Sequence, residues 1–589
     1  MTLATLDWVI IAAFFVVSLA IGLAVSKKAG SSVSEFFLSG RNMPWWLLGI
    51  SMVATTFSAD TPNLVTDLVR TSGVAGNWGW WAFLLTGMLT VFVYAKLWRR
   101  SEVLTDVEFY ELRYSGKAAS FLRGFRALYL GLIFNVLVMG AVSLAAVKFG
   151  EVILGMPGWQ TLLIAGSVTL VYSALGGLRA VIITDFVQFI LAMIGSIWAC
   201  IYLVNMPEVG GLSNLLANVN VSDKLSILPS FDDPDVWVPV LIVPLAVQWW
   251  ASYYPGAEPG GGGYIAQRMF SAKDEKHAIG ATFLFNIAHY ALRPWPWILI
   301  ALASLVVFPN LSDLQTAFPD LPADKLGHDV AYPAMLSFLP TGLLGLVAAS
   351  LIAAFMSTMS TQLNLGASYL VNDFYQRFIK PEASDKELVW AGRWFTVVST
   401  ILGLGLGLML TSASQAFTYL LLLGAGTGLI YILRWFWWRI NAMTEIVAMI
   451  SSLIIASVFT FADTGLKGWQ TIIIGAVLTT IIWIIATYFT PPTDDETLRA
   501  FYKKIRPGGN GWDAVLEKAA AEGEPIQKEQ GQLPLEILAM MVACITVYGA
   551  LFATGSWIYG EGTNAMILTA ITALGALFLF RVRTKIKVG

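Results

Sequence analysis

The chain has 589 residues, of which 57% are hydrophobic and only 13% charged, a balance outside the range of ordinary soluble domains. About 336 apolar residues are enough for roughly fifteen membrane spans of about 20 residues each. The formal net charge of -2 gives no reason to expect a nucleic-acid partner. Cys200 and Cys544 lie in apolar runs without ligand spacing, which excludes zinc, iron-sulfur and disulfide frameworks. The composition therefore predicts a polytopic membrane protein.

The apolar runs are continuous over about 20 residues rather than alternating over about 10, so helices are favoured over a β-barrel. The first run has no basic residue before it, and Lys27 and Lys28 follow it, so we expect a retained helix rather than a cleaved signal. The expected spans, fifteen in all, are residues 6–25, 44–70, 77–98, 121–152, 158–176, 180–204, 236–255, 278–307, 341–376, 390–411, 413–433, 443–463, 469–489, 534–555 and 563–580.

The charges of the loops give an orientation, because Lys and Arg gather on the cytoplasmic side of a membrane protein. The loops at 205–235 and 308–340 carry nine acidic residues, against Lys224 and Lys325 as their only Lys or Arg. We therefore predict an N-terminus outside, a cytoplasmic C-terminus and a multi-pass protein of the cell inner (plasma) membrane. Residues 491–533, with eight acidic and six basic side chains, are expected to form a small cytoplasmic helical insert, either regulatory or a solvated linker.

Polar residues inside spans are costly and indicate function. In the second span Ser58, Asp60, Thr61 and Asn63 surround Pro62. Proline removes an amide donor and clashes with the preceding turn, so carbonyls near Ser58 lose their helical partner. These carbonyls need a cation, a water or another helix. The alternative is a proline kink repaired by the Ser and Thr hydroxyls.

The seventh span is interrupted more severely, since residues 254–264 contain two prolines and five glycines. No continuous helix tolerates that composition. Two blocks of five helices would then each begin with a broken helix. Because each block has an odd number of spans, the second block starts on the opposite side of the membrane. This pattern predicts an inverted-repeat transporter with its site at the two breaks.

The ninth span contains a polar face. Ala354, Ser357, Thr358 and Thr361 fall at i, i+3, i+4 and i+7, which is one face of a helix. Hydroxyl and carbonyl oxygens without full charge suit a monovalent hard cation, since a divalent ion would require more carboxylates. The alternative is that these hydroxyls only bond to the backbone or pack against a neighbouring helix.

Three stretches carry a family resemblance: Tyr172–Gln188, which reads Tyr-Ser-Ala-Leu-Gly-Gly-Leu-Arg-Ala-Val-Ile-Ile-Thr-Asp-Phe-Val-Gln, together with Ala354–Thr361 and Tyr264–Lys273. Over residues 6–440 the chain resembles the sodium/solute symporter family, which includes the sodium-glucose cotransporters. The resemblance implies an all-α membrane protein with a five-plus-five inverted-repeat core, whose first and sixth core helices are broken. The expected parts are 1–43, an extra N-terminal helix and loop; 44–204 and 236–440, the two repeats; 441–490, accessory helices; 491–533, the insert; and 534–589, the C-terminal helices.

The resemblance also implies two sodium sites. The first takes the backbone carbonyls of Ala54, Phe57 and Ala354 and the hydroxyls of Ser357 and Thr358. The second takes Asp185, Ser357, Ser360 and Thr361. On its own helix Asp185 has no basic residue closer than Arg179, so a bound cation would supply its partner. The alternative is a structural Asp185 near the cytoplasmic end.

The substrate residues depart from the family pattern. Sugar-transporting members of the family carry a stretch similar to Asn-Gln-Tyr-Ile shortly before a Gln-Arg pair. At the same place, before Gln267 and Arg268, this chain has Gly262-Gly263-Tyr264-Ile265. We expect free amides of the glycine run to bind an anionic group and Glu258 to bind a hydroxyl or an amine. His289 and Arg293 share a helix face and fit either a substrate contact or a pairing of Arg293 with Glu258. The candidate substrate residues are Asp60, Thr61, Asn63, Trp80, Gln248, Glu258, Tyr264, His289 and Arg293.

These features predict a sodium-coupled secondary symporter that imports a small polar organic solute by alternating access. The solute is expected to be a sugar, a sugar derivative, or an organic or amino acid, and it moves with one or two Na+ ions through a monomer in the lipid bilayer. No Ser/His/Asp, His-rich or paired-carboxylate constellation recurs among the spans, so we expect no enzyme. Two alternatives stay open: a proton-coupled transporter that uses Asp185, and a membrane sensor on a transporter scaffold.

Overall fold

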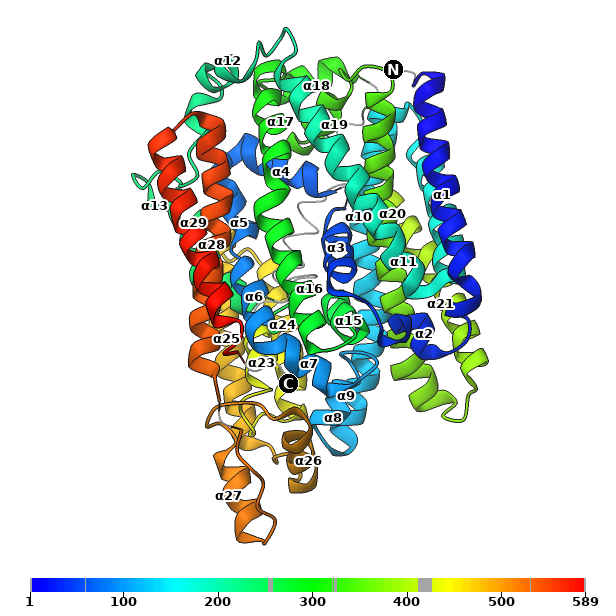
Figure 1. The fold of residues 1–589 in the computed structure, drawn as a ribbon, viewed down its shortest axis with the longest axis vertical. Helices are drawn as coiled ribbons and strands as arrows, with labels where there is room; N and C mark the ends of the chain where they lie inside the picture. The colour runs from blue at the N-terminus through cyan, green and yellow to red at the C-terminus, as the bar shows by residue number, and fades with distance from the viewer. Residues whose placement is uncertain are drawn as a thin grey trace.

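The computed structural model describes residues 3–586 except 59, 253–257, 320, 322–325, 411–425 and 530. The described chain forms a bundle of helices, from which α26 and α27 project at one end, opposite the end where the chain begins (Figure 1). Twelve helical segments among the described residues are long and apolar enough to cross a membrane. Helices are the expected form, because hydrocarbon offers no partner for backbone polar groups.

The candidate spans follow one another along the chain. They are α1 (Thr5–Ala29); Val74–Ser101, which includes α6 (Leu84–Leu89) and α7 (Ala95–Ser101); Gly116–Leu154, with α9 (Gly116–Leu128) and α10 (Asn135–Phe149); α11 (Gly158–Val204); Pro234–Ala251, ending in α14 (Trp249–Ala251); Glu275–Val307, with α16 (Glu275–Ile287) and α17 (Pro294–Val307); Leu343–Ile379, with α20 (Leu343–Ser368); α21 (Asp385–Met409); α24 (Ala442–Phe461); α25 (Gly468–Phe489); α28 (Leu533–Tyr559); and α29 (Gly562–Val582). Shorter helices include α3 (Trp45–Thr56), α4 (Asp60–Ser72), α8 (Phe109–Arg113), α15 (Gly263–Ser271), α23 (Gly428–Leu433), α26 (Asp495–Ile505) and α27 (Asp513–Ala521).

Three features explain why twelve segments stand where fifteen spans were expected. The expected spans 158–176 and 180–204 both lie in α11, which is interrupted by non-helical backbone at Gly177 with φ 53°. The expected span 44–70 is divided into α3 and α4, each too short to cross a bilayer alone. The expected span 413–433 lies mostly outside the described residues.

Helix α20 lies at the centre of the bundle, since every one of its residues except Leu346 is buried. It packs along α11, and α11 in turn packs along α1. Asp7 of α1 accepts hydrogen bonds from the amides of Gly342 (2.7 Å) and Gly345 (2.8 Å) at the start of α20. A carboxylate at a helix N-terminus satisfies orphan amides and matches the helix dipole. This contact fixes the extra N-terminal helix to the central one.

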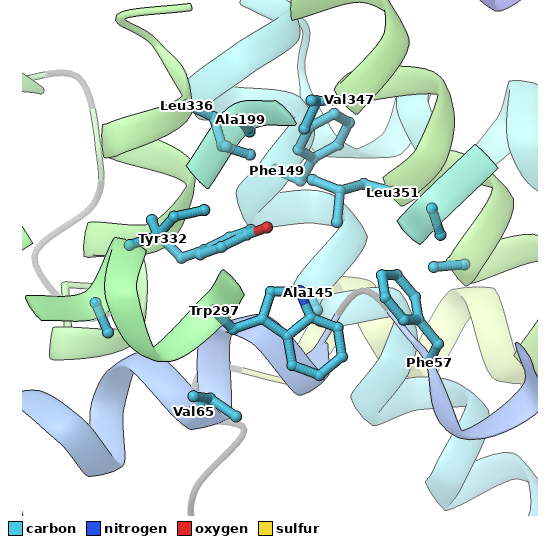
Figure 2. Packing of buried hydrophobic residues seen from close by; sticks show 14 of the residues in the cluster. Phe57, Val65, Ala145, Phe149, Ala199, Trp297, Tyr332, Leu336, Val347 and Leu351 are labelled. Atoms are coloured by element: carbon cyan, nitrogen blue, oxygen red, sulfur yellow. The ribbon is translucent and has the colours of Figure 1, made fainter. Parts of the chain in front are cut away.

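A cluster of buried apolar side chains surrounds the end of α3. The ring of Phe57 lies 4.8 Å from that of Trp297 in α17. Figure 2 shows Phe57, Trp297 and Tyr332 in this cluster together with Leu351 of α20. The contact between the rings of Phe57 and Trp297 helps to fix the end of α3.

Helix α26 packs against α7 and α8 of the bundle, and α27 packs against α26. Trp512 is fully buried, and its indole N–H donates to the carbonyl of Trp435 at 2.9 Å. Its ring stacks on Phe501 at 5.4 Å, and the guanidinium of Arg113 from α8 lies 4.9 Å from the ring centre. The insert therefore contacts the ends of spans through a buried aromatic and cation–π cluster.

An ionic network joins α8, α9 and the end of the Leu343–Ile379 segment. Arg123 pairs with Glu111 and with Asp373, each at 2.8 Å, and Arg377 pairs with Glu111 at 2.9 Å. Partial burial alone would raise the pKa of Glu111, but hydrogen bonds from Arg377, Ser120 and Arg123 outweigh it and lower that pKa to about 2. Glu111 is therefore ionised over the whole physiological range.

Candidate sodium and solute sites

The first break lies where Pro62 predicted it. Helix α3 ends at Thr56, and α4 begins at Asp60. The hydroxyl of Thr61 donates to the carbonyl of Thr56 at 3.0 Å, and the hydroxyl of Thr358 donates to the carbonyl of Thr55 at 2.7 Å. Side-chain hydroxyls therefore take two of the carbonyls that the break releases, as one reading of the sequence expected.

One candidate of the first sodium site, Thr358, joins α20 to the end of α3 at this break. The Thr358 hydroxyl lies 2.7 Å from the carbonyl of Thr55 and 3.3 Å from that of Ala354. Ala54 is adjacent to Thr55, and its carbonyl receives the amide of Phe57 at 3.1 Å. The hydroxyl and carbonyl oxygens that α3 and α20 bring to this contact are uncharged, and such donors suit a monovalent hard cation.

Asp185 is fully buried at the same level of the bundle. Its two carboxylate oxygens accept hydrogen bonds from Ser51 (2.5 Å) and from Ser357 (2.6 Å). The guanidinium of Arg268 lies 3.6 Å from the oxygen that Ser51 contacts. On its own helix Asp185 has no basic residue closer than Arg179, but the fold brings Arg268 of α15 next to it. A buried carboxylate with a cationic partner and two donors is well compensated.

Arg268 connects both broken helices to the central helix. It is fully buried and donates to Ser51 of α3 at 3.2 Å and to Thr361 of α20 at 2.7 Å. The hydroxyls of Thr361 and Thr55 are 3.0 Å apart. Ser360, the remaining candidate of the second site, donates to the carbonyl of Ser357 at 3.0 Å. Three of the four candidates therefore belong to one hydrogen-bond network around Arg268.

A cavity lies beside the second break. Its lining residues are Phe83, Thr86, Gly87, Thr90, Glu258, Gly261, Ile265, Thr282, Phe285, Asn286 and Tyr290. The cavity has a volume of about 290 Å³, part of which is open to solvent. The cavity is partly open, and its lining combines threonine hydroxyls, the Asn286 amide and the Glu258 carboxylate with apolar side chains.

Comparison with known proteins identifies the scaffold. Residues 36–454 match the Sodium:solute symporter family. The chain belongs to this family. It is therefore a multi-pass sodium:solute symporter and a transporter rather than an enzyme.

Two relatives and one solved structure illustrate the similarity of this symporter to characterised proteins. A sodium/glucose cotransporter of Vibrio parahaemolyticus is 27% identical over 520 residues, which cover 84% of this chain and 92% of the relative. A sodium/mannose cotransporter of Bos taurus is 26% identical over 67% of this chain and 68% of the relative. The structure of a Na+-coupled sialic acid symporter in a substrate-bound outward-open state superposes with a TM-score of 0.68 at 20% identity, covering 83% of this chain and 99% of that one. This last likeness shows a shared fold.

Of the nine candidate substrate residues in the symporter, Glu258 lines the cavity directly. Trp80 stacks on the cavity residue Tyr290 at 5.8 Å, and His289 meets Tyr290 edge-on at 4.4 Å. The others lie elsewhere in this conformation: Gln248 donates to the carbonyl of Gly79, Tyr264 lies under the guanidinium of Arg268, and Asp60, Thr61 and Asn63 form the first turn of α4.

His289 and Arg293 contact each other and the first break. Arg293 lies 3.3 Å from the ring of His289, and both reach the hydroxyl of Thr56, at 3.1 and 2.9 Å respectively. Arg293 also reaches the carbonyl of Val53 at 3.4 Å. His289 and Arg293 thus lie on one helix face, as expected, and both contact the end of α3. The alternative pairing of Arg293 with Glu258 stays a prediction.

The structure adds cavity residues that the sequence reading missed. Thr282, Asn286 and Tyr290 line the cavity from one side. Their spacing of i, i+4 and i+8 in an apolar span is a signal that the sequence contained. The side chain of Asn286 also lies where a Cβ on Gly87 would have to fit, which explains the glycine there.

Two amides of the glycine run are already bonded within the protein. The amide of Gly263 donates to the carboxylate of Asp106 at 2.9 Å, and the amide of Gly261 donates to the carbonyl of Glu258 at 2.8 Å. The expected anion site at these two amides is therefore taken by the protein itself. The pairing of Asp106 with Gly263 could not be predicted from local sequence, because the two residues are 157 positions apart.

Proposed function

We propose that this symporter couples sodium entry to the import of a neutral sugar or a similar polyol by alternating access. The names of the relatives, a glucose and a mannose cotransporter, support a sugar as the solute. The cavity supports the same class, since the hydroxyls of Thr86, Thr90 and Thr282 and the amide of Asn286 offer donors and acceptors without charge.

Sodium coupling rests on one observation: the Thr358 hydroxyl joins the end of α3 to α20. We propose a first ion held by the carbonyls of Ala54, Phe57 and Ala354 and the hydroxyls of Ser357 and Thr358. Such an ion replaces the hydrogen bonds that now close this junction and holds α3 against α20. Each positive charge that enters contributes about 2.3 kcal/mol per 100 mV of membrane potential.

A second ion is proposed at Asp185, Ser357, Ser360 and Thr361. In this structure the guanidinium of Arg268 compensates the charge of Asp185. A second sodium ion at Asp185 would compensate part of that charge instead and so weaken the pairing of the carboxylate with Arg268. Release of Arg268 would alter the position of α15, on which the solute cavity depends. This link offers a physical route from ion binding to the solute site.

The proposed architecture is the five-plus-five inverted repeat over 44–204 and 236–440, within about fifteen spans of a monomer. Support comes from the breaks between α3 and α4 and between α14 and α15, which begin the two blocks. The Lys and Arg distribution supports an outside N-terminus and a cytoplasmic C-terminus in the cell inner membrane. A cysteine placed at Glu524 should then react with an impermeant reagent only after the membrane is opened.

A thermal-shift screen of the purified protein tests the proposed solute. Neutral sugars, sugar acids, polyols and amino acids are compared in sodium and in potassium. A solute at 100 times its Kd adds about 2.7 kcal/mol to the stability of the state that binds it. We expect stabilisation by a neutral sugar in sodium and its loss in Thr358→Val. Stabilisation by amino acids alone, or equal shifts in potassium, would contradict the proposal.

A further inference from the structure

Asp106 caps the second half of the broken helix from a distant loop. It lies in the segment between α7 and α8, is buried, and accepts the amide of Gly263, the first residue of α15, at 2.9 Å. Its other carboxylate oxygen accepts the hydroxyl of Tyr369 at 2.6 Å. Both oxygens of Asp106 therefore have a defined partner.

The N-terminus of a half-helix is a common binding position for anions in transporters. A helix N-terminus exposes orphan N–H groups and a partial positive charge, and it attracts anions. In transporters built on broken helices, half-helix N-termini point at anionic groups of the substrate. Here a carboxylate of the protein occupies that place at α15.

Asp106 also lies next to the wall of the solute cavity. A Cβ added to Gly262 would lie 3.4 Å from the Asp106 carboxylate and 3.3 Å from the Cβ of Glu258. Glu258 and Gly261 both line the cavity. Two acidic side chains thus lie beside Gly262: Glu258 lines the cavity, and Asp106 lies behind the glycine segment that includes the cavity residue Gly261.

The loop that carries Asp106 is held in place. Thr105 donates to Asp373 at 2.5 Å, and the indole N–H of Trp98 in α7 donates to the carbonyl of Gly260 at 2.8 Å. The glycine segment is therefore anchored at both of its ends by residues of one region. Asp106 cannot leave α15 without breaking several of these contacts.

We propose that Asp106 is a specificity-determining residue, whose carboxylate caps α15 in place of a substrate anion and so selects neutral over anionic solutes. The inference rests on the proposed function and refines it. The cap fixes Gly263, two residues from the cavity residue Gly261. The negative charge close to this segment repels a carboxylate on the solute.

The test compares D-glucose with D-glucuronate, which differ by a carboxylate in place of one hydroxymethyl group. Sodium-dependent uptake into proteoliposomes and thermal shift are measured for wild type, Asp106→Asn and Asp106→Ser. Both variants remove the charge and leave an oxygen that can accept the Gly263 amide. We expect the preference for glucose over glucuronate to fall about tenfold, a size typical of a charge at a helix end in a partly buried site.

Matched controls separate charge from structure. Asp106→Glu keeps the charge and should keep the preference. Tyr369→Phe removes the other hydrogen bond of Asp106 without altering the charge, and it too should keep the preference. An unchanged preference in both neutral variants, or an equal loss in Tyr369→Phe, would overturn the inference.

The test of charge exclusion by Asp106 can fail or succeed independently of the test of a sugar as the solute. Absence of sodium-dependent glucose uptake in wild type would contradict the proposed solute. The glucuronate affinity of Asp106→Asn, measured by thermal shift against wild type, still tests charge exclusion in that case. A gain supports the inference, and no gain overturns it.

Discussion

The pair formed by Asp185 and Arg268 gives the most demanding test of the ion sites. Asp185→Asn keeps the size of the side chain but leaves a fully buried guanidinium without its carboxylate. Removal of one partner of a buried ion pair costs about 3–5 kcal/mol, because an uncompensated charge remains. Arg268→Gln should cost a similar amount for the same reason.

The double variant distinguishes a pair from two independent residues. Asp185→Asn combined with Arg268→Gln removes both charges, so it should be more stable than the sum of the single effects by about 1–3 kcal/mol. Thermal or chemical unfolding of the purified protein measures this coupling. Strict additivity would refute the pairing on which the reasoning rests.

The same double variant tests the second ion in a protein that folds. If Asp185 holds an ion, the sodium Hill coefficient for uptake should fall from above unity to unity, since that coefficient is bounded by the number of sites. Neither change replaces a proposed ligand of the first site. A Hill coefficient that is the same in wild type and in the double variant would assign Asp185 a structural role.

Three further predictions concern other regions. Ser357→Ala should weaken sodium dependence more than Ser360→Ala, because the Ser357 hydroxyl belongs to both proposed sites; equal sodium affinities in uptake titrations would remove that role. Trp512→Ala should destabilise the protein by about 3–5 kcal/mol and expose the insert to protease, because the indole is fully buried; unchanged unfolding and cleavage would show that the contact is weak. Glu111 has a pKa lowered to about 2 from 4.5, so its stabilisation is complete above pH 4.5 and is lost as the pH falls toward 2; Glu111→Gln should remove this part of the acid dependence of unfolding, and identical acid titrations would argue against it.

The positions of the breaks could be predicted from the sequence, because they depend on local chemistry. Pro62 disfavours helix in the turn before it, and the run from Pro255 to Gly263 combines two prolines with five glycines, which no continuous helix tolerates. The polar face of residues 354–361 likewise follows from helix periodicity alone. The fold places that face against the end of α3, where Thr358 meets the carbonyl of Thr55.

The partners of the key groups could not be predicted, because they come from elements distant in sequence. Arg268 stood in the sequence as one more basic residue of a loop, yet in the fold it meets Asp185. Asp106 had no distinguishing pattern at all, and only the packing of its loop brings it to Gly263. The docking of Trp512 also depends on tertiary contacts, since the charged composition of the insert equally fitted a solvated linker.

The central claim is that sodium drives a neutral sugar through this chain by way of the junction between α3 and α20. The direct measurement is the uptake of labelled glucose into proteoliposomes of purified protein under an inward sodium gradient, with potassium as the matched cation. We predict accumulation in sodium that is absent in potassium and is lost in Thr358→Val. Equal uptake from both salts, or full sodium-driven accumulation by Thr358→Val, would contradict the account.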